Sequence, residues 1–360
     1  MSDHIVSVDA GNGMVNAVLA RPGGKYRSVA FPSVRAAATG DSLGLDDFEL
    51  KYFYADWNGF RYVVGDDVTR VTRRHLERHT GGNRYGNELH AFLIAVALAR
   101  LGIKSGTVDL TVFAPPGMFR EARETMPGRL MEYDGQVTIK LSTDKRPRSW
   151  QYQKITVWPE GIGAAACFIL DAKGQPSGSD ALAGDVVILD SGVHTLDALV
   201  LSDGNFNPEN LQSTTYEDGG IDTHIRQPIL QALKKVSDDF APISVDDVDR
   251  AIRTGLDTGD YTLTSGGASV DLQKLLDKYR ERYAEWVGNN IIDGPLDGLR
   301  GIKSLILVGG GAVLIEDHIK RWHGDKLLDR TKSPEIKKIH PVDLNAVGGL
   351  RLALMQGKHK

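Results

Sequence analysis

Two stretches of the chain place apolar runs and polar turns in the same order. Residues 186–189 are four consecutive apolar residues, a polar turn follows, and residues 195–201 resume a run of strand-forming residues. Near the start of the chain, residues 5–9 and 14–20 flank a second polar turn. Because short apolar runs on either side of a glycine-containing turn are typical of hairpins, both stretches are predicted to be β-hairpins.

Each predicted hairpin carries chemistry at its turn. Asp9 ends the first strand of one hairpin, Asp190 ends that of the other, and a glycine follows two residues later in each. Glycine lets the backbone approach a ligand closely, and a carboxylate suits magnesium, which takes oxygen ligands. The hydroxyls of Ser191 and Thr195 can donate to an anion. Either stretch alone is equally consistent with a plain polar turn, but the repeated design favours two similar halves that clamp one nucleotide across a cleft.

The rest of the pattern predicts helices and strands in an order typical of α/β proteins. Strands are expected at residues 26–32, 60–64, 108–114, 136–142, 151–157 and 302–308. Helices are expected at residues 87–101, 159–170, 221–236, 244–254, 272–286, 312–321 and 342–355. Residues 136–142 and 151–157 are expected to pair as antiparallel strands. Pro159 and Glu160 are expected to open the helix that follows, because both residue types favour a first turn.

Glycine clusters suggest further ligand contacts. Gly219 and Gly220 precede a predicted helix, where a glycine pair suits a bound anion or simply a turn. Residues 309–311 are three glycines between a buried strand and a helix, which is a nucleotide-binding arrangement because side-chain-free backbone can lie against a base, ribose or phosphate. Leu314 takes the third glycine position of the dinucleotide fingerprint, so NAD is disfavoured, and the chain has no P-loop motif.

Small residues suggest a close contact between two distant helices. Residues 161–166 contain two glycines and three alanines, and residues 346–349 form a second small patch. These patches can nest against each other and make a hinge where two halves meet. Cys167 is interpreted as part of this packing and not as a nucleophile. Residues 173–180 are rich in Gly, Pro and Ser and mark a boundary just before the second hairpin.

Composition and charge limit the ligands and the cellular compartment that we expect for this protein. The 360 residues carry a formal net charge of -4, so no global positive field attracts nucleic acid, and direct nucleic-acid binding is not expected. The single cysteine excludes an intramolecular disulfide and fits a reducing compartment. The chain has neither an export signal nor a long apolar run, so a cytoplasmic protein that makes no membrane contact is expected.

A basic cluster at residues 70–79 has several interpretations. Its four arginines and two histidines can form a filament contact or an adaptor surface, although a solvated basic face is favoured. His75 and His79 have the spacing of a zinc pair, but no third ligand is apparent, so a metal is not expected there.

Taken in order, these pieces resemble the five signature segments of the actin superfamily of ATPases. The matching segments are phosphate loop one at residues 9–13, the first connecting helix at 160–170, phosphate loop two at 190–197, the adenosine loop at 308–313 and the second connecting helix at 345–355. The strand end VDLTVFAPP and the segments VWPEGIGAA and LVGGGAVLI look most like the ParM (StbA) plasmid-segregation proteins and related archaeal actin-like proteins. The resemblance spans the whole chain.

The resemblance implies an α/β, actin-like ATPase fold with two ribonuclease-H-like domains around a nucleotide cleft. One domain is expected at residues 1–172 with 342–360, and the other at 173–341. The cofactor implied is ATP or GTP with Mg²⁺. The carboxylates of Asp9 and Asp190 match those that hold the metal's water shell, and Glu160 matches the glutamate that positions the attacking water.

The resemblance also implies the nucleotide contacts. They are expected from Gly11, Asn12, Gly13, Ser191, Gly192, His194, Thr195, Gly219, Gly220, Gly309, Gly310 and Gly311. Asn12 and Gly13 depart from the hydroxyl or basic residues of many relatives. Asn-Gly is also a strong signal for a type I′ turn, so these residues can serve the hairpin alone.

As a function, the resemblance implies a filament that assembles head to tail with nucleotide and reaches DNA through an adaptor protein. The alternative is a soluble sugar or metabolite kinase of the same superfamily, for which Asp197 or Asp222 can supply the substrate base. A chaperone-like nucleotide switch is the least favoured interpretation.

Overall fold

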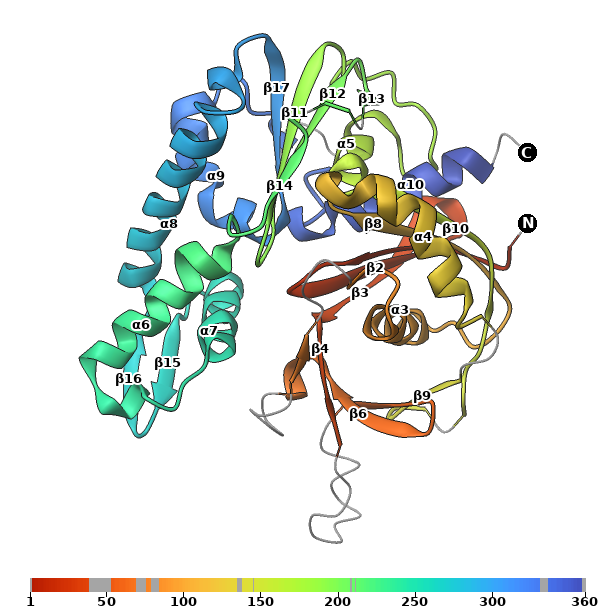
Figure 1. The fold of residues 1–360 in the computed structure, drawn as a ribbon, viewed down its shortest axis with the longest axis horizontal. Helices are drawn as coiled ribbons and strands as arrows, with labels where there is room; N and C mark the ends of the chain where they lie inside the picture. The colour runs from red at the N-terminus through yellow and green to blue at the C-terminus, as the bar shows by residue number, and fades with distance from the viewer. Residues whose placement is uncertain are drawn as a thin grey trace, which may run out of the picture.

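The computed structural model describes residues 2–38, 53–68, 76–78, 84–134, 138–144, 146–207, 209–210, 212–330 and 336–357. The described residues form two halves that lie side by side, each built on a central sheet (Figure 1). The mixed sheets and the helices packed on them confirm the predicted α/β class. The predicted domain boundaries at residues 172 and 342 stay a prediction.

The central sheet of the first half is built around the N-terminal hairpin. In spatial order its strands are β10 (Gln151–Pro159), β8 (Thr107–Ala114), β1 (His4–Ala10), β2 (Met14–Arg21) and β3 (Lys25–Pro32). The first three of these strands are parallel, and β2 and β3 continue the sheet as antiparallel strands. The predicted hairpin at residues 5–20 is therefore confirmed.

The central sheet of the second half repeats this plan. Its strands are β13 (Asn205–Phe206), β12 (Leu196–Ser202), β11 (Asp185–Ser191) and β17 (Ile302–Val308), and β14 (Thr214–Tyr216) also pairs with β12. The hairpin strands β11 and β12 are antiparallel, and β11 pairs with β17 in parallel. In both halves, then, the first strand of the hairpin lies between its antiparallel partner and a parallel strand.

Each half carries a smaller appendage. In the first half it is an antiparallel sheet of β7 (Glu77–Arg78), β4 (Val34–Ala37), β6 (Phe60–Val64), β5 (Tyr54–Trp57) and β9 (Ile139–Leu141). In the second half it holds the hairpin of β15 (Thr262–Ser265) and β16 (Ala268–Asp271) beside α6 and α7 (Figure 1). The helices are α3 (Glu88–Arg100), α4 (Phe119–Met131), α5 (Ile162–Ile169), α6 (Gln227–Val236), α7 (Val245–Thr258), α8 (Gln273–Val287), α9 (Gly309–His323) and α10 (Leu344–Gly357).

Helices α5 and α10 pack between the two central sheets. Alternate residues of a strand point to opposite faces of its sheet. On β11, Val187 and Leu189 pack into the core of the second half, while Val186 and Ile188 pack with α5 and α10. On β2, Val18 joins this same shared core, whereas its neighbours face α3. The shared core therefore joins the two halves.

Three local expectations were wrong. Residues 139–141 and 151–159 form β9 and β10 in different sheets, where β10 pairs with β8 in parallel, so the two strands are not antiparallel partners. Pro159 ends β10 and does not open a helix, and Gly161, with φ of 91°, precedes α5. Neither Asn12 nor Gly13 has a positive φ, so a type I′ turn does not form there.

None of the helices in the described part of the chain combines the length and apolar character that crossing a bilayer requires. Of the basic segment at 70–79, residues 70–75 and 79 lie outside the described residues, and with them the suggested histidine pair.

Candidate functional site

The turns of the two hairpins have the same backbone hydrogen bond. In the first turn Gly11 N donates to Met14 O at 3.0 Å, and in the second Gly192 N donates to Thr195 O at 2.9 Å. The turns also meet. A Cβ on Gly13 would lie 2.0 Å from Cγ2 of Val193, which leaves no room for a side chain at position 13. Gly13 is needed for this approach and not for the turn conformation.

Both aspartates face one pocket between these turns. Asp9 stands opposite Asn16 in the first hairpin, and Asp190 stands opposite Asp197 in the second. Asp9, Asp190 and Glu160 line a cavity of about 360 Å³. This volume is within the range of roughly 300–1,000 Å³ found for small-molecule sites. The expected convergence of the two turns on one groove is therefore observed.

The expected ligand contacts divide into two groups. Those that line the pocket are Gly11, Asn12, Gly13, Gly192, His194, Thr195, Gly309 and Gly310. Those that lie outside its lining are Ser191, Gly219, Gly220 and Gly311. The second group packs against protein. The Ser191 hydroxyl is 2.6 Å from that of Tyr283, and a Cβ on Gly311 would lie 1.8 Å from Ser191 Oγ. Gly220 N donates to His194 O at 3.1 Å. These residues shape the wall and do not face its cavity.

The carboxyl groups of the site hold protons strongly because they are buried together. Burial, with repulsion from Asp9 and Asp197, raises the pKa of Asp190 to about 8. Burial, with repulsion from Asp343 and Asp197, raises the pKa of Asp9 to about 7. The Asn345 amide acts in the opposite direction on both carboxyls. Such a cluster is stabilised by a cation, because opposite charge favours the ionised form.

The donor set fits magnesium held through water. The Oδ1 atom of Asn12 is buried without a hydrogen-bond partner among the described residues, so an oxygen ligand is available in the pocket that the two aspartates line. Across the described ranges, no group of three or more His, Cys, Asp or Glu side chains is arranged to coordinate a metal directly. Magnesium keeps several of its waters and needs few protein ligands, so this arrangement suits it better than zinc.

Asn345 ties the site to the helices between the halves. Its Nδ2 donates to Asp190 Oδ2 at 2.5 Å, while its Oδ1 accepts from the backbone of Gly161 at 3.0 Å. Beside it, α5 and α10 touch through backbone, as the small patches predicted. A Cβ on Gly348 would lie 1.6 Å from the carbonyl oxygen of Gly163. Cys167 is buried in this packing, and burial raises the pKa of its thiol to about 12, which agrees with a structural role.

Glu160 reaches the pocket from the end of β10. Its backbone N donates to Ala114 O at 2.8 Å, which continues the pairing with β8 beyond the strand end. Burial, together with the neighbouring Asp197, raises the pKa of the Glu160 carboxyl well above its ordinary value. Tyr85 donates its hydroxyl proton to Glu160 Oε1 at 3.4 Å, and Arg84 Nη2 donates to the Tyr85 hydroxyl.

Sequence reasoning missed Arg84 and Tyr85. Both are buried, Arg84 lines the pocket, and its guanidinium carbon lies 4.5 Å from the centre of the Tyr85 ring. Burial raises the pKa of both Glu160 and Asp197, and the Arg84 charge opposes this rise. The two residues precede α3, whose N-cap is Asn87. The sequence signal available was only an Arg-Tyr pair before a helix, which has no specific meaning by itself.

The two carboxylates suggested as a substrate base differ in exposure to the pocket. Asp197 is buried and accepts from Thr195 at 3.1 Å and from Thr215 at 2.5 Å, and it is absent from the pocket lining. Asp222 lines the pocket, and its Oδ2 is 3.9 Å from Nδ1 of His194. Asp222 is therefore the only one of these two that faces the cavity.

Two family models of actin-like proteins match this chain, one in each half. The model of the actin-like proteins N-terminal domain matches residues 7–163, and that of the archaeal actin homologue MreB-like C-terminal domain matches residues 188–321. Among curated protein sequences, none matches this chain.

Solved structures match over nearly the full length. One is the 15-stranded ParM filament from Clostridium botulinum, with a TM-score of 0.71, 19% identity and coverage of 98% of this chain and 99% of that chain. Another is Bacillus thuringiensis ParM with ATP, with a TM-score of 0.71, 16% identity and 99% coverage of both chains. A third is Ta0583, an archaeal actin homologue in complex with ADP, with a TM-score of 0.68, 19% identity and 99% coverage of both.

The duplicated hairpin sheets, the shared helices and the paired turns agree with these matches along the whole chain. The chain has the actin-like fold, and its N-terminal and C-terminal parts match the family models of actin-like proteins and of archaeal actin homologues respectively.

Proposed function

We propose that this protein is a filament-forming ATPase whose assembly is driven by a nucleotide bound with Mg²⁺ between the two hairpin turns. The observation that carries the proposal is that Asp9 and Asp190, far apart in the sequence, line one pocket. Similar chains bind adenine nucleotides, since ParM from Bacillus thuringiensis was solved with ATP and Ta0583 with ADP. ATP is therefore the first nucleotide to test, with GTP beside it.

Each side chain has a stated part in the proposed hydrolysis. Mg²⁺ would neutralise phosphate charge, and Asp9 and Asp190 would hold its waters. Backbone amides at the turns would hold the phosphates, because Gly11 and Gly192 leave room for close approach. Glu160 would orient the attacking water. Phosphoryl transfer depends on positioning and charge neutralisation more than on a strong base, so a carboxyl with a raised pKa is sufficient for this task.

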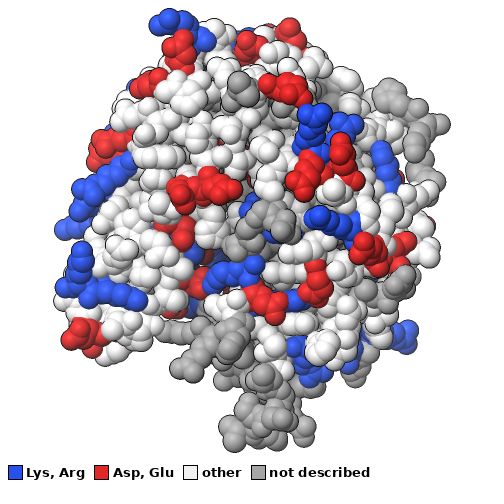
Figure 2. Space-filling model, in the orientation of Figure 1, with Lys and Arg blue, Asp and Glu red and all other residues white. Residues whose placement is uncertain are grey.

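The proposed partner is another copy of the same chain. Head-to-tail contacts that do not close into a ring produce open helical polymers. The ParM of Clostridium botulinum supports this, because its solved structure is a filament. Contact with DNA would go through an adaptor protein. Figure 2 shows basic and acidic side chains interspersed on one face of the described residues, without a broad area of a single sign.

High-speed sedimentation with Mg²⁺ and ATP tests the proposal. The protein is expected in the pellet with ATP and in the supernatant without nucleotide, with filaments visible by electron microscopy and phosphate release in the same sample. A protein that stays soluble and hydrolyses ATP only when a sugar is added would instead support the kinase alternative. Asp222, which faces the pocket, would then be the base to mutate.

A further inference from the structure

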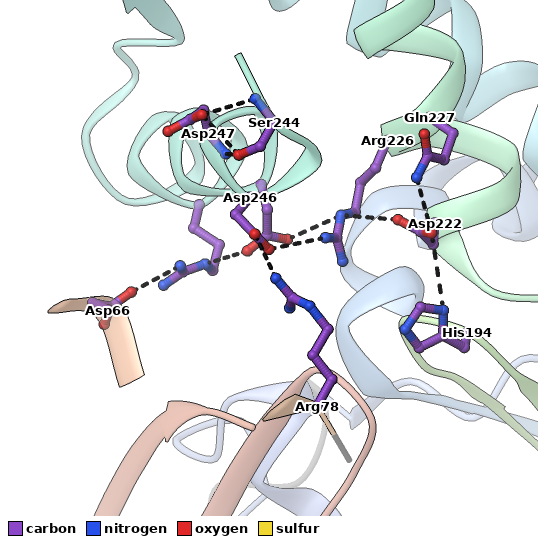
Figure 3. A network of polar contacts seen from close by, with 11 residues as sticks. Asp66, Arg78, His194, Asp222, Arg226, Gln227, Ser244, Asp246 and Asp247 are labelled. Carbon is purple, nitrogen blue, oxygen red and sulfur yellow. Dashed lines mark hydrogen bonds and ion pairs between the residues drawn. The ribbon is translucent and has the colours of Figure 1, made fainter. Parts of the chain in front are cut away.

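A row of alternating charges connects the two halves at the pocket (Figure 3). In the first half, Asp66 lies in the short helix η2 (Gly65–Asp67), which directly follows β6, and Arg78 lies in β7. Both residues face α7 of the second half. Arg78 Nη2 is 2.5 Å from Asp246 Oδ2, and Arg253 Nη2 is 3.0 Å from Asp66 Oδ1. The first half therefore contacts α7 at two points. It supplies the basic residue at one of them and the acidic residue at the other.

Arg226 organises the acidic side of this row. Only 7% of its side chain is exposed, and its guanidinium nitrogens lie 3.5 Å from Asp222, 3.8 Å from Asp246 and 3.6 Å from Asp249. Asp249 in turn is 2.9 Å from Arg253. Because Arg226 is shared among these carboxylates, it fixes the face of α7 that the first half meets.

The row encloses the cavity that holds the two aspartates. Asp66, Arg78 and Arg253 line the same pocket as Asp9 and Asp190. The row lies at the appendages of the two halves, whereas the halves are joined at α5 and α10 (Figure 1). If the halves rotate about α5 and α10, contacts far from these helices resist the separation of the halves most effectively. The Arg78–Asp246 pair is also partly shielded, with 33% and 17% of the two side chains exposed, so solvent and salt screen it less than a surface pair.

We propose that Arg78 and Arg253 latch the two halves over the pocket and set the rate at which a bound nucleotide leaves. The proposal rests on the proposed nucleotide site and adds to it a determinant of nucleotide exchange that lies outside the two hairpin turns. Because filament turnover depends on how long a nucleotide is held, the latch would also set the lifetime of the assembling form.

The test is the release rate of a fluorescent ATP analogue, measured by chasing the Mg²⁺-bound complex of the full chain with excess ATP. Arg78→Ala is expected to release the analogue roughly three to ten times faster than the wild type. The release rate of Arg78→Lys should lie between those of the wild type and Arg78→Ala. Arg78→Glu should release the analogue fastest, because it places two negative charges together. In the Arg78→Ala background, Asp246→Asn should add little, because the pair is already broken.

Arg120→Ala is the matched control. Arg120 in α4 also pairs across the halves, with Glu209 at 3.2 Å, but 80% and 75% of these side chains are exposed and neither lines the pocket. The release rate of Arg120→Ala should equal that of the wild type. Equal rates for Arg78→Ala, Arg120→Ala and the wild type would overturn the latch while leaving the nucleotide site intact. A wild-type protein that binds no nucleotide would overturn the proposed function itself.

A second measurement uses the salt dependence of the release rate. Raising the salt concentration should accelerate release from the wild type, because the latch is electrostatic. Release from Arg78→Gln should respond less to salt. Equal salt responses of the two proteins would contradict the latch.

Discussion

Gly13 and Val193 bring the two halves into contact at the tips of their hairpins: a Cβ at position 13 would lie 2.0 Å from Cγ2 and 2.9 Å from Cβ of Val193. Gly13→Ala should push the turns apart and weaken binding of Mg²⁺-ATP by about tenfold, the result of a strain on the order of 1–3 kcal/mol. Val193→Ala in the same chain should restore part of the affinity, because it removes Cγ2, the atom that clashes most, and keeps only Cβ at 2.9 Å.

Calorimetry on the single and double variants measures this relationship. Gly128→Ala is the control, since a Cβ there would meet nothing within 4 Å. An unchanged affinity for Gly13→Ala would show that the contact between the turns does not hold the site together.

Asp190→Asn is expected to have opposite effects on stability and on binding. The pKa of Asp190 is raised to about 8 in the folded chain, so this carboxyl contributes stability at low pH that is lost as the pH rises from about 4 towards 8. At pH 8 without metal, Asn should therefore raise the free energy of unfolding by about 1–3 kcal/mol and raise Tm by several degrees. In Mg²⁺-ATP, the wild type should gain more stability than the variant.

Thermal unfolding at pH 5.5 and pH 8, with and without Mg²⁺-ATP, measures both effects. The same dependence of Tm on pH in the two proteins would exclude Asp190 as the buried charge that the metal stabilises.

Glu160→Ala should leave nucleotide binding intact and reduce phosphate release by about 100-fold or more, because the attacking water loses its orienting group. Filaments of this variant should persist longer than those of the wild type. Phosphate release at the wild-type rate would remove Glu160 from the mechanism.

Tyr85→Phe tests the hydroxyl that donates to Glu160 at 3.4 Å. Losing a donor destabilises the ionised carboxylate, so the pKa of Glu160 should rise further and the acid limb of the rate profile should move to higher pH. The turnover number should fall roughly three- to tenfold, while nucleotide affinity stays the same. A profile that overlays that of the wild type would limit Tyr85 to a packing role.

The sequence predicted most of the central framework because its signals are local and repeated. The buried run at residues 302–308 became β17 with the same bounds, and the helix predicted to start at residue 244 has Ser244 as its N-cap, where Ser244 forms a capping box with Asp247. The small patches at 161–166 and 346–349 could be paired because only small residues allow backbones to touch. The two turns could be matched because each has an aspartate followed by a glycine two residues later.

What the sequence did not predict depends on partners that are distant along the chain. Residues 139–141 and 151–159 are close in sequence, yet they enter different sheets, and strand pattern alone does not select a partner. The sequence predicted that the Ser191 hydroxyl donates to an anion, but in the structure this hydroxyl is hydrogen-bonded to that of Tyr283. Arg78 is one of several arginines in a basic segment, and its role depends on Asp246, which lies on α7 in the other half.

We propose that the turns of Asp9 and Asp190 share one metal and one triphosphate. A crystal structure with Mn²⁺ in place of Mg²⁺ and a non-hydrolysable ATP analogue tests it directly through the anomalous signal of the metal. We expect one strong peak in the pocket between the two carboxylates, with the phosphates against the backbone of both turns. A metal and phosphates bound to one turn alone, or outside this pocket, would contradict it.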